Sequence, residues 1–116
     1  LPFFSSPAVN ERLVLIGSRD KHLHAINRTS GEVAWKFQTG GRVEGSPIVF
    51  EDAVVFGSSD GRLYAARLDG GTELWQLDLG EALVASPAFG EHLIVIGGEK
   101  GTVFAIRSGP ALPKKA

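Results

Sequence analysis

The sequence predicts an all-β fold made of repeated four-stranded antiparallel units, and three observations support this prediction. Ser-Pro pairs begin at positions 6, 46 and 86, so the chain repeats with a period of 40 residues. A short β-branched run that ends in glycine follows each pair, at residues 14–17, 54–57 and 94–97. With 15 Gly and 6 Pro punctuating the chain, no window carries the apolar periodicity of an amphipathic helix.

The period divides the 116 residues into two complete units and part of a third. We assign residues 1–40 to the first unit, 41–80 to the second and 81–107 to the third, with 108–116 as a tail. The third unit is predicted to lack its outer strand, because the residue 40 positions beyond Trp75 is Lys115. The preceding strand would then have an open edge, to which another chain can add.

Four strands are expected in each unit. In the first unit they are predicted at residues 5–9, 12–18, 22–27 and 32–38. The hairpin between the second and third strands is clearest in the second unit, where Asp60-Gly61 predicts a two-residue type I′ turn. The equivalent Asp20-Lys21 has no glycine, so this turn is expected to be longer or strained.

The strands in the middle of each unit are apolar on both faces, as residues 23–26 and 63–66 illustrate. Because no helices are expected, other sheets must cover these faces. Four-stranded antiparallel sheets of about 40 residues, stacked face to face around an axis, are the blades of a β-propeller. Since propellers have about four to eight blades, three units form an incomplete ring unless the chain oligomerises or is a fragment.

Residues 25–35 resemble the tryptophan-docking motif of pyrroloquinoline-quinone-like propeller repeats, written A-x-D-x-x-T-G-x-x-x-W. Asn27 stands at the Asp position and Ser30 at the Thr position. The second copy departs from the pattern, with Arg67 and Gly70 at these polar positions. The residues that carry the resemblance are Ala25, Asn27, Gly31 and Trp35 in the first copy, and Ala65, Gly71 and Trp75 in the second. Each tryptophan is expected to pack between neighbouring blades and to donate its indole N–H there.

The resemblance implies a propeller similar to that of the outer-membrane-protein assembly lipoprotein, in a bacterial periplasm or cell envelope. The same family includes quinoprotein dehydrogenases, which use an adjacent-cysteine pair beside the quinone and a calcium ion. This chain has no cysteine. Its recurring acidic residues Glu11, Glu51 and Glu91 occupy one repeat position, spread around the axis, so we interpret them as exposed turn residues. We therefore expect no enzyme activity, no cofactor and no metal ion.

Two histidines form the only other candidate for a metal site. His22 and His24 lie two residues apart on one predicted strand, so their side chains point to the same face. No third ligand is evident, and the repeat places His24 where the other units have Tyr64 and Phe104. We interpret His24 as a ring packed between sheets and His22 as partly exposed.

Composition excludes two further classes of protein. The chain has 12 Lys plus Arg against 13 Asp plus Glu, so its net charge of −1 offers no basic surface to nucleic acid. Its apolar runs reach four residues, whereas a helix needs about 20 to span a bilayer.

These observations together predict a non-catalytic propeller module that binds another protein through its loops or through the open strand edge. The alternatives are a fragment of a quinoprotein dehydrogenase and a structural module that self-associates to close a ring without another partner. The candidate interface consists of loop residues whose charge differs most between units: Arg19, Lys21, Arg42, Glu44, Glu81 and Lys100.

Overall fold

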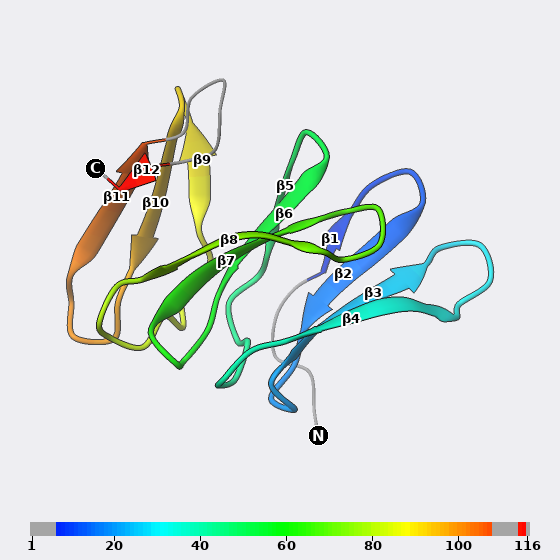
Figure 1. The fold of residues 1–116 in the computed structure, drawn as a ribbon, viewed down its shortest axis with the longest axis horizontal. Helices are drawn as coiled ribbons and strands as arrows, with labels where there is room; N and C mark the ends of the chain where they lie inside the picture. The colour runs from blue at the N-terminus through cyan, green and yellow to red at the C-terminus, as the bar shows by residue number, and fades with distance from the viewer. Residues whose placement is uncertain (1–6, 108–113, 116) are drawn as a thin grey trace.

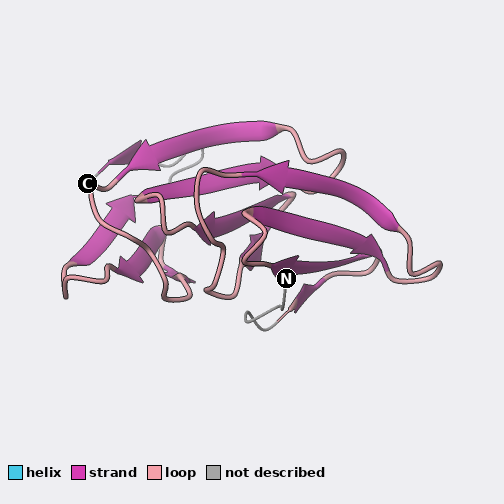
Figure 2. Ribbon diagram, turned by 90° about the horizontal axis from the view of Figure 1, so that it is seen from below, coloured by secondary structure: helices cyan, strands magenta, loops and turns pink. Residues whose placement is uncertain are grey.

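The computed structural model describes residues 7–107 and 114–115, and this part of the chain is built from strands and loops without a helix (Figure 2). No helix in the described residues is therefore available to cross a membrane. The strands form three four-stranded antiparallel sheets that stand side by side (Figure 1). Their strand order follows the chain order within each sheet, so the predicted all-β propeller architecture is confirmed.

Each sheet corresponds to one repeat of the sequence. The first sheet contains β1 (Ala8–Val9), β2 (Leu13–Gly17), β3 (His22–Asn27) and β4 (Val33–Gln38). The second contains β5 (Ile48–Phe50), β6 (Ala53–Gly57), β7 (Arg62–Arg67) and β8 (Glu73–Asp78). The third contains β9 (Ala88–Gly90), β10 (Leu93–Gly97), β11 (Val103–Arg107) and β12 (Lys114–Lys115).

The 40-residue period holds in the fine structure as well as in the strand positions. β2, β6 and β10 begin at residues 13, 53 and 93. The pairing of the third strand with the fourth shifts register after Ala25 in the first sheet and after Ala65 in the second. A β-bulge thus recurs at the same place, immediately beside the tryptophan of the outer strand.

The hairpins between the second and third strands differ from the predicted two-residue turn. In the second sheet Ser58 N–H donates to the Arg62 carbonyl at 3.1 Å, and Gly61 N–H donates to the Ser58 carbonyl at 3.1 Å. This is a three-residue loop that ends in a left-handed residue, Gly61, with φ 89°. The type I′ prediction was wrong because an Asp-Gly pair fits both loop types.

Lys21 occupies the same left-handed position in the first sheet, with φ 74°. A lysine there strains the backbone, because its Cβ crowds the neighbouring carbonyl where glycine has only a hydrogen. Ser18 N–H donates to the His22 carbonyl at 3.1 Å, so this loop also has three residues and is longer than a two-residue turn. The prediction of a longer or strained turn is therefore confirmed for both its length and its backbone strain.

The third sheet is more complete than expected. We predicted that its outer strand is missing and that residues 108–116 form a tail, but β12 pairs with Ile106 and Arg107 of β11. Residues 108–113 and 116 lie outside the described residues. The expected open edge is therefore partly filled, and the Lys-Lys sequence of β12 gave no strand signal that could have revealed this.

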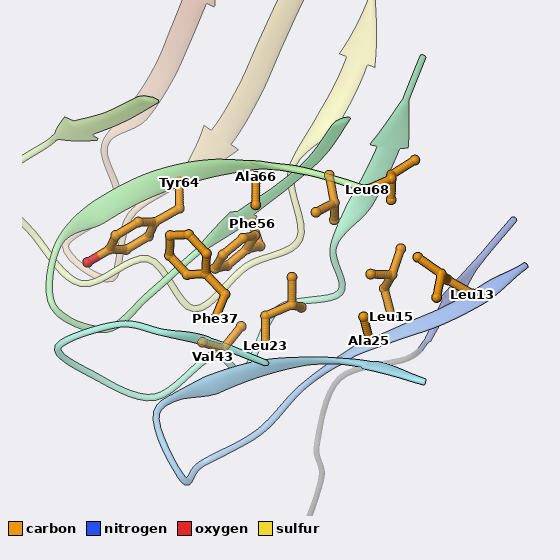
Figure 3. Close-up of a cluster of buried hydrophobic side chains, with 11 residues drawn as sticks. Leu13, Leu15, Leu23, Ala25, Phe37, Val43, Phe56, Tyr64, Ala66 and Leu68 are labelled. Atoms are coloured by element: carbon orange, nitrogen blue, oxygen red, sulfur yellow. The ribbon is translucent and has the colours of Figure 1, made fainter. Parts of the chain in front are cut away.

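Two apolar cores lie between the sheets. The first core joins the first and second sheets, with Leu15, Leu23 and Ala25 opposite Phe56 and Ala66, all fully buried (Figure 3). The second core joins the second and third sheets, where Val55, Leu63 and Ala65 meet Ile94 and Ile96. Among the described residues, both faces of the second sheet thus pack against another sheet, whereas the first and third sheets each have one face that does so.

Candidate functional site

Five connections come together at one end of the three sheets, along the lower edge of Figure 1. We call this surface the loop end; it comprises residues 18–21, 39–47, 58–61, 79–87 and 98–102. Every predicted interface residue lies on it.

Backbone hydrogen bonds join the loops between sheets, 39–47 and 79–87, to the hairpins on either side of them. Val43 N–H donates to the Ser18 carbonyl at 3.0 Å, and Leu83 N–H donates to the Ser58 carbonyl at the same distance. Within the second repeat, Ser59 N–H donates to the Arg42 carbonyl at 2.9 Å. The equivalent bond from Glu99 N–H to the Ala82 carbonyl is 2.8 Å long. The loop end is therefore held by the same bonds at both junctions.

Three predicted interface residues form one cluster between the first two repeats. Arg19 holds the Glu44 carboxylate through Nε and Nη2, both at 3.0 Å from Oε2. Arg42 approaches the same carboxylate, with Nη2 3.9 Å from Oε1. The Glu44 side chain is 17% exposed, against 39% for Arg19 and 49% for Arg42. Two guanidinium groups thus approach one carboxylate, and part of each remains exposed.

Lys21 contributes to this end mainly through its backbone. Its carbonyl accepts hydrogen bonds from the Thr39 N–H at 2.8 Å and from the Thr39 hydroxyl at 3.2 Å. The exposed side chain adds a further positive charge to the first hairpin.

Glu81 and Lys100 meet at the junction of the second and third repeats. The Glu81 carboxylate accepts a hydrogen bond from Lys100 N–H at 2.7 Å and one from the Thr102 hydroxyl at 2.6 Å. These bonds, that from Thr102 above all, lower the pKa of Glu81. Glu81 therefore has a structural role that the charge comparison did not reveal.

Between the first and second sheets, the corresponding carboxylate comes from the hairpin and not from the loop that connects the sheets. Asp60 Oδ2, on the second hairpin, accepts Gly40 N–H at 2.9 Å and also accepts the Tyr64 hydroxyl. Burial and this bond raise the pKa of Tyr64. Position 60 corresponds to Lys100 in the third repeat, which cannot accept a hydrogen bond. Between the second and third sheets the carboxylate is therefore that of Glu81, in the loop that connects the sheets.

His24 occupies the Tyr64 position in the first repeat and bonds to the equivalent aspartate. Its Nε2 lies 2.8 Å from Asp20 Oδ2, and the ring is buried. Burial raises the pKa of Asp20, but the bonds from His24 and the His22 backbone outweigh it, so the pKa is lowered. The sequence signal for this pair is an aspartate in the hairpin with a polar ring four residues later, which our prediction missed.

His22 and His24 do not form a metal site with other described residues. His22 is 28% exposed, as expected, and its Nδ1 faces the Asp20 carbonyl at 3.0 Å. Within residues 7–107 and 114–115 no three His, Cys, Asp or Glu side chains converge in a way that could hold a metal ion.

Trp35 joins the first sheet to the second. Its Nε1–H donates to the Leu68 carbonyl at 2.9 Å, and its ring lies against Gly71, where a Cβ would come within 2.5 Å of ring carbons. Trp75 is partly buried against the second core. The residue equivalent to Leu68 in the next repeat, Ser108, lies outside the described residues.

The turn before each tryptophan keeps its backbone bonds despite the sequence differences. Gly31 N–H donates to the Asn27 carbonyl at 2.8 Å, and Gly71 N–H donates to the Arg67 carbonyl at 3.0 Å. In the first copy the Asn27 side-chain oxygen also accepts N–H groups from Thr29 and Ser30. Arg67 lacks such an acceptor, so only these side-chain bonds are lost. The remaining motif residues, Ala25 and Ala65, are buried beside the bulges.

The opposite end of the sheets has a shallow hollow of about 360 Å³. It is lined by Asn10, Glu11, Arg12, Glu51, Asp52, Leu68 and Asp69. Glu11, Glu51 and Glu91 are all exposed, as predicted for turn residues.

Stacked four-stranded antiparallel sheets with a 40-residue period, joined by a tryptophan from one to the next, define this chain as part of a β-propeller. Residues 2–111 match the model of the pyrroloquinoline-quinone-like family described as outer membrane protein assembly factor BamB, and the chain belongs to this family.

Solved structures share the fold at low sequence identity. BamB from Moraxella catarrhalis matches with a TM-score of 0.77 and 19% identity, over 96% of this chain and 35% of its own. The quinohemoprotein alcohol dehydrogenase ADHIIG from Pseudomonas putida HK5 gives 0.82 and 18%, over 97% and 20%. The computationally designed Ika4 protein gives 0.76 and 18%, over 89% and 64%.

The chain therefore spans about a third of BamB and a fifth of the dehydrogenase. No curated protein sequence matches it significantly.

Proposed function

We propose that this chain is a non-catalytic part of a β-propeller and that it binds another protein through the loop end. The observation that carries the proposal is a contrast within that surface. The backbone hydrogen bonds between repeats recur at equivalent positions, whereas the side chains of the same loops change in charge. Arg19, for example, corresponds to Ser59 in the second repeat and to Glu99 in the third. A rigid scaffold with position-specific charges is well suited to recognition.

The chemistry of the loop end favours an acidic surface on the partner. The Arg42 side chain is 49% exposed beside Glu44, and the exposed Lys21 on the first hairpin adds a second positive charge. Arginine presents a planar fork that can bind carboxylates in pairs, so an acidic patch complements it. Membership of the BamB family supports a protein as the partner.

Charge reversal tests this proposal. The tagged chain, the double variant R19E/R42E and the control R67E would each be incubated with an extract of the source cells, and bound proteins identified by mass spectrometry. Arg67 is a suitable control because it is 50% exposed and pairs with Asp52 away from the loop end. We expect one protein to bind the original chain and R67E but not the double variant.

Equal binding by all three chains would place the interface elsewhere, and a lack of any specific partner would contradict the proposal. A rise in melting temperature on addition of pyrroloquinoline quinone with Ca²⁺ would instead favour the dehydrogenase alternative, in which binding of a cofactor stabilises the folded state.

A further inference from the structure

The chain contains two aspartates that are followed directly by glycine, in the pairs Asp60-Gly61 and Asp69-Gly70. In such a pair the backbone nitrogen of the glycine can attack the side-chain carboxyl carbon of the aspartate and close a five-membered ring. Glycine favours this reaction because it has no Cβ to shield its nitrogen or to restrict its backbone. The two pairs are thus chemically alike, and their surroundings determine whether either one reacts.

Hydrogen bonds hold the first pair away from reaction. Asp60 Oδ1 accepts the Arg62 N–H at 2.9 Å, and Oδ2 accepts the Gly40 N–H at 2.9 Å. The Tyr64 hydroxyl also donates to Oδ2. The attacking group is engaged as well, since Gly61 N–H donates to a backbone carbonyl of the same hairpin at 3.1 Å. Ring closure here would have to break hydrogen bonds to both reacting groups.

The second pair, in the turn between β7 and β8, has no such bonds. In the part of the chain that the structure describes, neither the Asp69 carboxylate nor the Gly70 N–H has a hydrogen bond or an ion pair. Both residues are exposed, and Asp69 borders the shallow hollow. A Cβ built on Gly70, which has φ 89°, would meet no atom within 4 Å. The carboxyl group and the backbone nitrogen can therefore approach each other in water.

We propose that Asp69 isomerises spontaneously through a succinimide formed with Gly70. The Gly70 nitrogen bonds to Asp69 Cγ, and the Cγ–OH bond of the protonated carboxyl group breaks. The hydroxyl group and the amide proton leave together as one water molecule. One water molecule then opens the ring. Attack at Cγ restores aspartate, whereas attack at the backbone carbonyl carbon of Asp69 leaves an isoaspartyl residue, so the reaction needs no oxidant and no other reactant.

The position of the pair gives this reaction a structural consequence. Residues on both sides of the pair hold Trp35 of the first sheet: the Leu68 carbonyl accepts its indole N–H at 2.9 Å, and the backbone at Gly71 lies against its ring. An isoaspartyl linkage adds one atom to the main chain between these two contacts, because the main chain then runs through Cβ and Cγ. The two contacts cannot keep their present spacing, so isomerisation should loosen the junction between the first and second sheets.

Incubation of the folded chain at neutral pH in water enriched in heavy oxygen tests the reaction, because ring opening incorporates one oxygen atom from the solvent. Trypsin cuts after lysine and arginine, so the two pairs appear in different peptides, residues 43–62 and 68–100. Chromatography and fragmentation by mass spectrometry then locate the heavy oxygen and the isoaspartyl residue. We expect Asp69 to react at least about tenfold faster than Asp60, whose hydrogen bonds must first be broken.

The same incubation in concentrated guanidinium chloride is the matched control. Unfolding removes the hydrogen bonds of Asp60, so the two pairs should then react at similar rates. A difference in rate that persists in the unfolded chain would overturn the structural basis of the proposal, because local sequence would then distinguish the two pairs.

Asp69→Glu is the control variant for the structural consequence. Glutamate keeps the charge, but it must close a six-membered ring, which forms far more slowly. After prolonged incubation, the original chain should unfold at a lower urea concentration than a fresh sample. It should also give a second, shifted NMR signal for the Trp35 indole N–H. The incubated Asp69→Glu chain should match its own fresh sample in both measurements.

An absence of heavy oxygen at Asp69 in the folded chain, or equal incorporation at Asp60 and Asp69, would overturn the proposal. An isomerised chain with unchanged unfolding and an unchanged Trp35 signal would overturn its effect on the junction. The loop-end proposal concerns other residues and would survive any of these results.

Discussion

Two glycines at the same repeat position separate the effect of backbone conformation from that of packing. Gly31 and Gly71 have φ values of 77° and 73°. A Cβ on Gly31 meets no atom within 4 Å, whereas one on Gly71 would lie 2.5 Å from the Trp35 ring. The two positions thus differ in their contact with a tryptophan.

Replacing each glycine by alanine should therefore have unequal effects. Gly31→Ala should lower the free energy of unfolding by about 1 kcal/mol, the cost of a left-handed alanine. Gly71→Ala should cost about 1–3 kcal/mol more, because the ring must move. Urea denaturation of both variants measures the difference. Equal losses would show that the Trp35 ring accommodates the added methyl group without a cost in stability.

For single residues, the sequence predicted which side chains pack between repeats but not all of the groups to which they bond. The role of Trp35 between neighbouring repeats followed from the motif, whereas its acceptor, the Leu68 carbonyl, did not. That contact depends on the angle between two sheets, which no local pattern encodes. Asp20 and His24 were missed for another reason, since each residue alone has a more common role in a turn or a core.

Among the elements, the hairpin between β2 and β3 is the least suited to its conformation. Lys21 has φ 74° where the other two hairpins have Gly61 and Gly101. Lys21→Gly should raise the free energy of unfolding by up to about 1 kcal/mol, since relief of the left-handed strain exceeds the entropy that glycine adds to the unfolded chain.

The reciprocal change, Gly61→Lys, should destabilise the second hairpin by about 1–2 kcal/mol. Thermal or urea unfolding checks both variants. A destabilised Lys21→Gly chain would mean that lysine contributes a compensating interaction at this turn.

Element positions were predictable because the alternation of apolar residues and the spacing of turns are local properties. The predicted strands 22–27 and 32–38 differ from β3 and β4 by at most one residue at either end. The hairpin type was not predictable from Asp60-Gly61, because one residue of loop length separates the two alternatives. β12 was missed because pairing with β11, and not β-propensity, makes Lys114–Lys115 a strand.

In the whole molecule, the second sheet differs from its neighbours because both of its faces are covered. Val54, Phe56, Leu63 and Ala65 are all fully buried. Backbone amides in β6 and β7 should therefore exchange with solvent most slowly, followed by those of the first sheet and then the third. Hydrogen exchange followed by mass spectrometry or NMR measures this order. Equal protection in the second and third sheets would contradict it.

The number of repeats and their face-to-face arrangement followed from the 40-residue period and from strands that are apolar on both faces. The unequal exposure of equivalent residues did not, because Leu23 and Val103 look alike in sequence. What distinguishes them is the presence or absence of a neighbouring sheet, a property of the assembled molecule.

The different origin of the carboxylates at the two junctions limits which residues can be exchanged between equivalent positions. At the first junction Asp60 faces the glycine-rich loop at Gly40, and at the second Glu81 accepts the Lys100 N–H. An aspartate at position 100, copied from position 60, would bring a second negative charge to Glu81, and the two charges would repel. The residues at positions 81 and 100 therefore depend on each other, although the backbones of the repeats are nearly interchangeable.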